Sequence, residues 1–466
     1  MGKSFRSDDL DQALLLPPSL HDWLPENHLA HFVAEVVKQL ELGAIYASYE
    51  EKDGRGQSAY APEMMVRVLL YGYCTGIYSS RKIQAKSYEN VAFRFLAANE
   101  HPDHSTLAEF RKRHLQALAG LFWQALQMCQ KAGLVKLGHV ALDGTKMAGN
   151  ASKHKAMSYA RMNAAEAKLQ QEVEELLRRA QAVDEAEDEK YEKGQRGDEL
   201  PAELARRESR LKKIRAAKAE LEAEAKQKAE GEKAAAEARL VERREQEARL
   251  GKKLTGRKPH VPDPEKAVPE PSSQRSFTDP DSRIMPEGSR KGNFIQGYNA
   301  QAAVDGEAQV IVAAEVIQDS TDNHQLVPML QQVEQNLGIK PQAASADCGY
   351  WDPHQVGDQR LAGIDLHVAT EKHKHGEPTD DDPSASAPGD SLREQMKQKL
   401  RTAVGRNLYR MRKAIVEPVF GQIKEWRGFR RFSLRGLPQV RAEWKLICAT
   451  HNLLKLFRSG RAFQMT

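Results

Sequence analysis

The sequence predicts an α/β protein that has an all-α N-terminal segment and carries a helical hairpin as an insertion. Three observations support this fold class. Apolar residues recur at helical spacing through the first 135 residues. Two strand-like stretches each end in an aspartate beside a glycine, at Asp143 and near Asp347. Between them, residues 155–255 are rich in Ala, Glu, Lys and Arg and have heptad spacing, as expected of paired helices.

Composition indicates a chain of more than one domain with a basic C-terminal end. The 466 residues exceed one typical domain, and 40% hydrophobic residues are enough for a core. The formal net charge is only +5. Residues 401–466, however, contain 15 Lys and Arg against three Glu, a net charge of +12. Such a block favours a phosphate backbone as the partner, with an anionic membrane surface a weaker alternative.

The cysteines and the hydropathy pattern indicate a soluble, cytoplasmic protein. The four cysteines lie far apart without CxxC spacing, which argues against a zinc site or a disulfide framework: Cys74, Cys129, Cys348 and Cys448. We find no signal-peptide pattern at the N-terminus and no run of 18 apolar residues. We therefore expect no membrane span.

The N-terminal segment, residues 1–135, is predicted to be helical. Helices are expected over Leu29–Leu40, Met64–Tyr73, Ser79–Ala97 (in two segments) and Leu107–Gln130. Thr106 and Glu109 match a capping box that would open the last of these. Short basic helices in succession suit a helix-turn-helix that reads DNA. An ordinary helical bundle explains the same pattern equally well.

The strand-like stretches begin at residue 138. Residues 138–146 alternate like a strand that ends at Asp143, although an Asp-Gly pair alone usually marks only a turn. We expect two further strands at 295–304 and 309–316, joined by an Asp305-Gly306 turn. A helix at 323–337, stopped by Gly338, and a short strand at 343–347 that ends at Asp347 should follow.

The insertion is predicted to be an antiparallel helical hairpin. Its heptad positions form two apolar seams, Leu169, Val173, Leu176, Ala180 and Val183, and Leu204, Leu211, Ile214 and Leu221. Gly194, Gly197 and Pro201 break the pattern between them. Residues 256–290 are expected to be a linker, and 371–394 a low-complexity loop. His373 and His375 in that loop form an HxH pair that suits a metal, but a solvated loop explains them better.

Residues 409–436 place one carboxylate, Glu417, among basic side chains. On a helix, Lys413, Glu417 and Lys424 share one face. The bland interpretation is a solvated amphipathic helix; the functional one is a metal ligand beside a polyanion. Pro418 predicts that the helix begins or kinks near the acid.

Taken together, the chain resembles the DDE transposases of bacterial insertion sequences. Four phrases carry the resemblance: ALDGTKMAGNASKHKAMSY, GYNAQAAVD, ADCGYWD and VEPVFGQIKEWRGFRRFSLRG. It implies an RNase H-like mixed sheet flanked by helices, formed by residues 136–154 and 291–466. The helical residues 1–135 are then a DNA-binding domain, and 155–255 a coiled-coil insertion.

The resemblance also implies the site. Asp143, Asp347 and Glu417 would be the three catalytic acids and the ligands of Mg²⁺, with Mn²⁺ as a substitute. The family's Tyr and Arg fall less regularly, on Tyr409 and on Arg412 or Lys413. Residues expected to bind DNA phosphates are Lys424, Arg427, Arg430, Arg431, Arg435, Arg412 and Lys413. Trp351 or Trp426 would stack on a displaced base, although each is more often a core residue.

The implied function is DNA cleavage and strand transfer at insertion-sequence ends. The partner is double-stranded DNA, comprising terminal inverted repeats and target, bound by a homodimer in the cytoplasm at the nucleoid. Two alternatives remain open from the sequence: a related nuclease that cuts without joining, and a non-catalytic DNA-binding protein whose coiled coil drives assembly.

Overall fold

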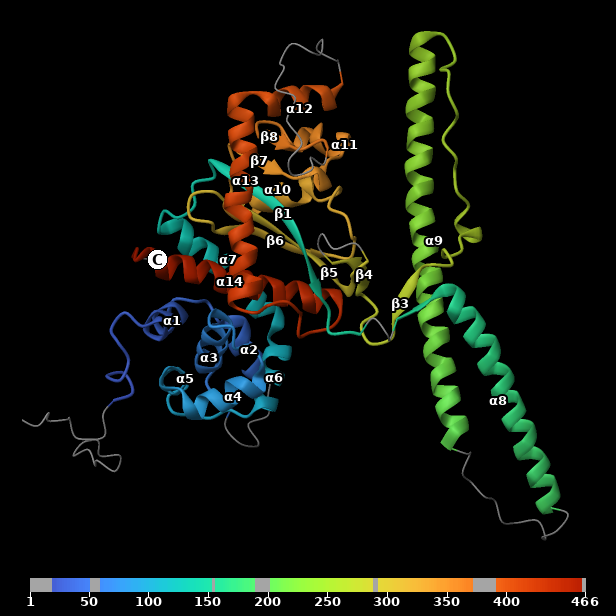
Figure 1. The fold of residues 1–466 in the computed structure, drawn as a ribbon, viewed down its shortest axis with the longest axis horizontal. Helices are drawn as coiled ribbons and strands as arrows, with labels where there is room; N and C mark the ends of the chain where they lie inside the picture. The colour runs from blue at the N-terminus through green and yellow to red at the C-terminus, as the bar shows by residue number, and fades with distance from the viewer. Residues whose placement is uncertain are drawn as a thin grey trace, which may run out of the picture. The chain divides into compact units, whose positions relative to one another are not determined.

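The computed structural model describes residues 19–50, 59–152, 156–188, 202–287, 292–371 and 391–462. Two compact units divide the chain (Figure 1). The first comprises Met1–Met147, Asn299–Leu434 and Pro438–Thr466, and the second Ala148–Tyr298 and Arg435–Leu437. His373 and His375 lie outside the described residues. None of the described helices is both long and apolar enough to cross a membrane.

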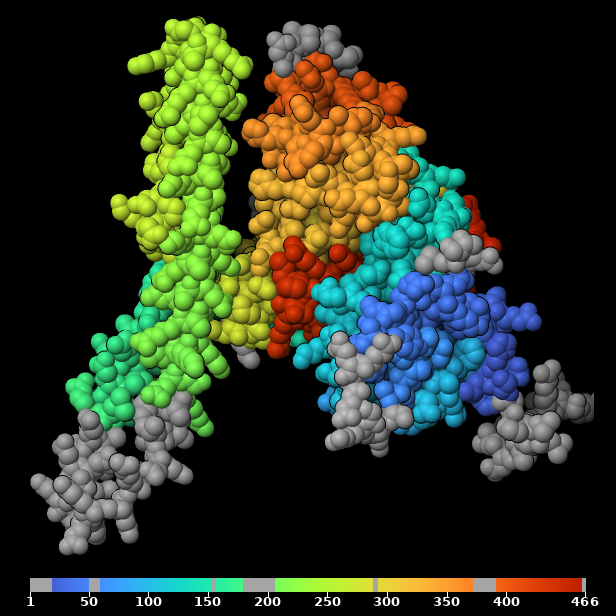
Figure 2. Space-filling model, turned by 180° about the vertical axis from the view of Figure 1, so that it is seen from behind, coloured from blue at the N-terminus to red at the C-terminus, as the bar shows by residue number. Residues whose placement is uncertain are grey.

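The N-terminal part of the first unit is helical, as predicted. Its helices are α1 (Leu29–Lys38), α2 (Gly43–Glu50), α3 (Pro62–Cys74), α4 (Ser80–Glu89), α5 (Val91–Leu96), α6 (His104–Arg113) and α7 (Leu115–Lys131). Figure 2 shows the first of these gathered into one cluster. The helix α3 is buried from Met64 to Cys74 along nearly its whole length, so it forms the centre of the cluster.

Two details of the predicted N-terminal helices were wrong. The expected single helix Leu107–Gln130 is two helices, because the chain turns at His114 between α6 and α7. The expected capping box at Thr106 does not form. Asp103 caps α6 instead, and its carboxylate accepts hydrogen bonds from the backbone N–H groups of Ser105 and Thr106.

The sheet of the first unit is the predicted RNase H-like mixed sheet. Its order is β6–β5–β1–β7–β8, with β1 (His139–Ala148), β5 (Phe294–Asp305), β6 (Ile311–Ile317), β7 (Ala343–Ala346) and β8 (Asp365–Val368). β5 and β6 are antiparallel, whereas β1, β7 and β8 are parallel. Val140, Ala141 and Leu142 are all fully buried, so elements pack on both faces of the central strand.

Helices pack on this sheet. α10 (Leu326–Leu337) contacts β6 and ends at Gly338, where φ is +75°, as the sequence predicts. α12 (Leu392–Arg401) and α13 (Ala403–Gly421) contact the far edge, and α14 (Leu437–Ser459) closes the chain. The Asn452 side chain of α14 donates to the carbonyl of Ile311 and accepts from its N–H, both at 2.8 Å. This amide clamp holds α14 on β6.

α13 begins at Ala403 and runs through Pro418. Of the two expectations for this proline, that the helix begins near it was wrong, and that the helix kinks there stays a prediction. A proline has no N–H and leaves the carbonyl four residues earlier, that of Ala414, without its helical donor. The Gln309 side chain fills the gap, because its Nε2 donates to Ala414 O at 2.9 Å. A π-helical turn, Gln422–Trp426, follows the helix.

The second unit is built on the predicted antiparallel hairpin, α8 (Tyr159–Asp188) and α9 (Ala202–Leu250). Figure 2 shows α9 as a long rod with projecting side chains. Leu169, Leu211, Ile214 and Leu221 from the predicted seams form a buried cluster with Met162 and Ala217. Val173 is also buried and Leu176 half-buried. Ala180, Val183 and Leu204 are outside the described side chains.

Part of the expected linker is ordered structure. β3 (Gln274–Ser276) pairs with β2 (Ala156–Ser158), and β4 (Arg283–Pro286) pairs with the start of β5. Within β3, the buried guanidinium of Arg275 forms ion pairs with Glu220 and Glu224 of α9. Residues 274–286 therefore belong to the second unit. Strand pairing and the ion pairs of Arg275 stabilise this segment in spite of its Pro/Gly/Ser-rich composition.

Candidate functional site

The parallel pairing of β1 with β7 places Asp143 beside Asp347. The pairs run from His139 with Ala343 to Ala141 with Ser345. Each aspartate comes two residues after the last of these pairs, and the two carboxylates are close enough for Asp347 to raise the pKa of Asp143. The expectation that Asp143 ends its strand was wrong, because β1 continues to Ala148. Asp143 instead lies just beyond the stretch of β1 that pairs with β7.

Asp143 is largely buried, and its surroundings act on its pKa in both directions. Burial raises the pKa most strongly, the Arg412 guanidinium lowers it, and the neighbouring carboxylates of Asp347 and Asp322 raise it; the net result is a pKa of about 6. The Gly144 N–H donates to Asp143 Oδ1 at 2.8 Å. Arg412 Nη1 lies 3.3 Å from Asp143 Oδ2. Like charges are therefore held close together, with one guanidinium as partial compensation.

Asp347 follows β7 directly and caps a short 3-10 turn, Cys348–Tyr350. Its Oδ1 accepts a hydrogen bond from the Gly349 N–H at 2.8 Å. A side chain at position 349 would meet this same oxygen, since a Cβ built on Gly349 lies 2.9 Å from it. The glycine after Asp347, which drew attention in the sequence, is therefore required by the close approach of the carboxylate.

Arg412, rather than Lys413, faces the aspartates. Arg412 is 6% exposed, whereas Lys413 is exposed to solvent. Burial lowers the Arg412 pKa, but Asp143, Tyr409, Asp347 and Glu417 together raise it above its usual value. The Arg412 guanidinium also lies 5.8 Å from the centre of the Tyr409 ring. Tyr409 and Arg412, the aromatic and the basic residue that the resemblance implies, thus lie on the same face of α13, the face toward the sheet.

Glu417 lies on an exposed face of α13. It comes five residues after Arg412, which turns it well around the helix from the buried guanidinium. Seven residues further, Lys424 is half-buried and reaches β1, where its Nζ contacts Thr145 Oγ1 at 3.0 Å and the Lys146 carbonyl at 3.2 Å. The sheet brings Asp143 and Asp347 together, and the Lys424 side chain contacts β1, the strand that carries Asp143.

Sequence reasoning missed a further carboxylate, Asp322, in the loop between β6 and α10. Asn299 Nδ2 and Gln301 Nε2 each donate to Asp322 Oδ1 at 2.6 Å. Lys146 Nζ lies 3.7 Å from the same oxygen. The loop has no periodic pattern that could have drawn attention to Asp322. The only hint in the sequence was the pair of amide side chains, Asn299 and Gln301, in the predicted strand GYNAQAAVD.

Comparison with protein families agrees with this geometry. Residues 18–113 match a transposase domain family (DUF772), and residues 268–453 match a transposase DDE domain family. Together the two matches cover more than half of the chain. The chain belongs to the DDE transposases of insertion sequences. No curated protein and no solved structure gave a significant match.

The basic residues of this transposase separate into buried and exposed groups. Arg427 is 3% exposed, and its Nη1 donates to Thr450 Oγ1 at 2.9 Å and to the Ile447 carbonyl at 3.4 Å. Burial lowers its pKa to about 10. Arg427 thus joins the π-helical turn to α14, and its burial removes it from the surface that DNA can reach. The Tyr73 carbonyl of α3 accepts from the same nitrogen.

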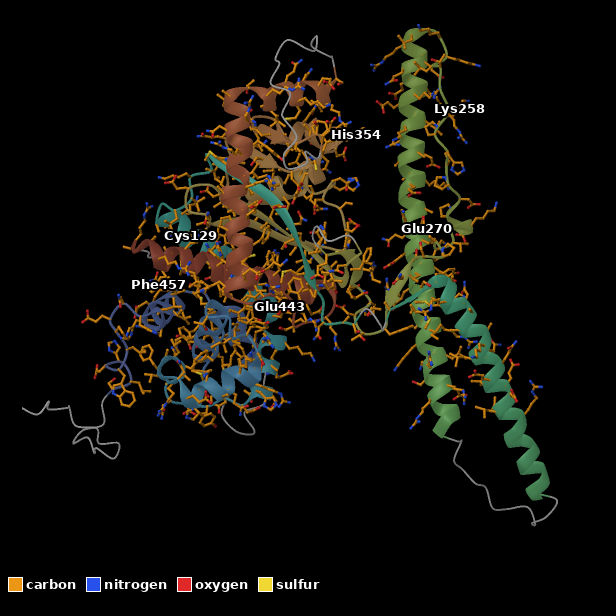
Figure 3. The ribbon with its side chains drawn as sticks, in the orientation of Figure 1. Cys129, Lys258, Glu270, His354, Glu443 and Phe457 are labelled. Atoms are coloured by element: carbon orange, nitrogen blue, oxygen red, sulfur yellow. The ribbon has the colours of Figure 1, made fainter. Side chains whose placement is uncertain are left out.

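Arg430, Arg431 and Arg435 are exposed. Arg430 forms an ion pair with Glu425, and Arg435, which belongs to the second unit, donates from Nε to the Asn150 carbonyl at 2.9 Å. Trp426 is 63% exposed, with the Arg458 guanidinium 5.1 Å from its ring, whereas Trp351 is half-buried. Glu443 of α14 (Figure 3) is buried and accepts hydrogen bonds from the Ser433 and Leu434 N–H groups, which fixes the backbone that follows Arg431.

DDE transposases use divalent metal ions in general. The donor set here is carboxylate oxygen, the chemistry that Mg²⁺ prefers. A fully buried carbonyl oxygen, Asn299 Oδ1, has no hydrogen-bond partner and lies 2.9 Å from the Cβ position of Gly144, beside Asp143. Among the described residues no three His, Cys, Asp or Glu side chains converge as a ready metal cage. The carboxylate oxygens therefore match the ligand chemistry of Mg²⁺. Of the three predicted ligands, Glu417 is the one that is exposed to solvent.

Proposed function

We propose that this transposase cuts DNA at the ends of an insertion sequence and joins those ends to target DNA. Asp143, Asp347 and Glu417 are the catalytic carboxylates, and they would hold Mg²⁺, or Mn²⁺ in its place. The observation that carries the proposal is the side-by-side position of Asp143 and Asp347 on parallel strands of an RNase H-like sheet, where the pKa of Asp143 is raised.

The electrostatics of the pair support binding of a cation. A carboxyl whose pKa is about 6 because of burial and two acidic neighbours is ionised at neutral pH at a cost in free energy. A divalent cation between such carboxylates removes that cost, so the cation and the ionised form stabilise each other. Arg412, whose Nη1 lies 3.3 Å from Asp143 Oδ2, compensates part of the negative charge and favours the ionised form of Asp143.

The reaction proceeds by two displacements at phosphorus. In cleavage, a water oxygen forms a bond to phosphorus, the bond to the 3′ oxygen breaks, and that oxygen takes a proton to become a 3′-hydroxyl. In joining, this hydroxyl oxygen loses its proton and bonds to a target phosphorus, and a target 3′ oxygen leaves. When bound, the divalent ions lower the charge on the attacking and leaving oxygens.

The chain's own residues orient the DNA for both steps. Lys424 is held against Thr145 and the Lys146 carbonyl of the strand that carries Asp143. An ammonium at this position would bind a phosphate next to the one being cut. Exposed Lys413, Arg430 and Arg431 would bind the flanking backbone. Since two transposon ends must be joined to one target, the active form on DNA would contain at least two copies of the chain.

The test is cleavage of a supercoiled plasmid bearing the element's own terminal repeats, incubated with protein and Mg²⁺. Asp143→Asn, Asp347→Asn and Glu417→Gln should each lower the rate by at least about a thousandfold, while DNA binding in gel-shift assays persists. Glu425→Gln is the matched control, because Glu425 is exposed on the same stretch as Glu417. It should retain the parental rate.

Each result discriminates between functions. Cleavage that survives Asp143→Asn or Asp347→Asn rejects the site. Cutting without joined products identifies a nuclease, and retention of DNA with no cutting in Mg²⁺ or Mn²⁺ identifies a DNA-binding protein. Joined products that depend on all three acids support the proposal.

A further inference from the structure

We infer that Asp322 is a fourth acidic residue of the catalytic centre, which strengthens cation binding at Asp143 and Asp347 through its charge. The inference rests on the proposed function. It is carried by the placement of Asp322 between two glycines, each next to one of the aspartates. A Cβ on Gly144 would lie 2.6 Å from Asp322 Oδ1, and one on Gly349 would lie 3.3 Å from Asp322 Oδ2.

The contacts of Asp322 are unevenly divided between its two oxygens. Oδ1 accepts from the Asn299 and Gln301 amides and lies 3.7 Å from Lys146 Nζ. No hydrogen bond to Oδ2 is found among the described residues, and this oxygen is the one near Gly349, beside Asp347. The amides thus fix the carboxylate through Oδ1, which lies on the Gly144 side, while Oδ2 lies on the Gly349 side.

The network behind Asp322 is rigid. Asn299 and Gln301 are fully buried on β5. Gln301 is fixed in turn, because Tyr350 donates its hydroxyl hydrogen to Gln301 Oε1 and Trp444 Nε1 donates to the Gln301 carbonyl at 3.0 Å. The buried Tyr350 ring lies three residues after Asp347. The same hydrogen-bonded chain therefore positions both acidic loops, the one after β6 and the one after β7.

A second observation points to a cation rather than to a purely structural network. Asn299 Oδ1 is buried beside Gly144 with no hydrogen-bond partner among the described residues, while its Nδ2 donates to Asp322 and to the Asp319 carbonyl. A buried carbonyl oxygen without a hydrogen bond destabilises the folded state. A water of a bound cation's hydration shell is a donor that would satisfy it.

Lys146 provides an opposite charge for the test. Its ammonium is half-buried; burial lowers its pKa, while Asp322, Asp143 and Asp347 raise it. If Asp322 acts by charge, then removing Asp322 should weaken cation binding and removing Lys146 should strengthen it. A structural role alone would not produce effects of opposite sign.

The experiment is titration of the DNA-free full-length chain with MnCl₂, with free Mn²⁺ followed by electron paramagnetic resonance. Asp322→Asn keeps a carbonyl for the two amides and removes the charge, so the Kd for Mn²⁺ should rise about tenfold. Lys146→Gln should lower the Kd, because it removes the opposing positive charge. Asp319→Asn is the matched control, since its side chain is exposed in the same loop and should not change the Kd. Thermal melting checks that each variant folds.

An unchanged Kd in folded Asp322→Asn overturns the inference. If that variant does not fold, Lys146→Gln decides: a lower Kd supports the inference, and an unchanged or higher Kd overturns it. Asp143→Asn in the same titration separates this result from the proposed function. Loss of binding in Asp143→Asn with no change in Asp322→Asn rejects only Asp322, whereas binding that survives Asp143→Asn rejects the proposed site itself.

Discussion

The aspartate centre of the first unit and the helical hairpin of the second are both dense in charge, but charge has opposite consequences in them. In the hairpin, acids of one helix lie against bases of the other: Arg215 and Lys218 of α9 flank Glu166 of α8 at 2.9 and 3.0 Å and lower its pKa. In the centre, carboxylates lie close to each other, and burial raises the pKa of Asp143. Paired surface charges contribute little free energy, whereas buried like charges create a demand for a cation.

The largest effect is expected from removal of the buried counter-charge. Arg412→Met should lower the free energy of unfolding by about 3–5 kcal/mol, because Asp143 would remain buried without its partner. Urea unfolding in the absence of divalent ions measures this. Lys413→Met, at the exposed neighbouring position, should change stability by less than about 0.5 kcal/mol. Equal effects of the two changes would contradict a special role of the Arg412 contact.

The hairpin should depend on its apolar seam. Ile214 is 1% exposed in the cluster with Leu169, Leu211 and Leu221. Ile214→Ala should destabilise the second unit by about 2–4 kcal/mol, since it removes buried methylenes and leaves a cavity. Hydrogen exchange of α8 and α9 amides is the readout, with Val241→Ala on the exposed face of α9 as the comparison. Equal protection in the two variants would show that the seam does not hold the hairpin.

Histidines extend the contrast to pH. Burial lowers the pKa of His139 to about 4, with His367 adding to the effect. The unfolded chain binds a proton near pH 6.5 and the folded one only near 4, so stability present above pH 6.5 is lost as the pH falls toward 4. The loss should reach about 3 kcal/mol.

His139→Gln should flatten the urea midpoint between pH 6.5 and 4.5, whereas the exposed His354 (Figure 3) should behave as a neutral control in His354→Gln. A slope that is identical in the parent and in His139→Gln would assign the acid sensitivity to other groups, such as His451, whose pKa burial also lowers.

The smallest effect is expected on the hairpin surface. Glu166→Gln removes the charge shared by Arg215 and Lys218 and should cost less than about 1 kcal/mol at 0.15 M salt. Thermal melting at low and high salt measures it, and the difference from the parent should shrink as salt rises. A loss as large as that of Arg412→Met would erase the distinction between the two regions.

Much of the frame was predictable from local patterns. Alternation and flanking glycines identified the strands around Asp143 and Asp347, heptads identified the seam, and Gly338 marked the end of α10. These features depend on neighbours in sequence, through periodicity, capping or backbone freedom.

What was missed depends on distant partners. Asp322 lies in a loop without periodicity and is brought to the site by amides of β5. Arg427 reads as one more surface base, and only the packing of α14 and α3 buries it. The strands β3 and β4 are three and four residues long, too short for a pattern, and Arg275 is buried through acids some 50 residues earlier.

Pro418 has a consequence for the helix that carries Glu417. One backbone carbonyl of α13, that of Ala414, accepts its hydrogen bond from outside the helix, from the Gln309 side chain at the β5–β6 turn. Gln309 adopts a left-handed φ of +57°, and Lys455 and His451 of α14 bind its side-chain and backbone oxygens. The stiffness of the helix next to Glu417 therefore depends on a turn more than 100 residues away in the sequence. A change in that turn would make the backbone around Glu417 more mobile without altering any residue of the helix.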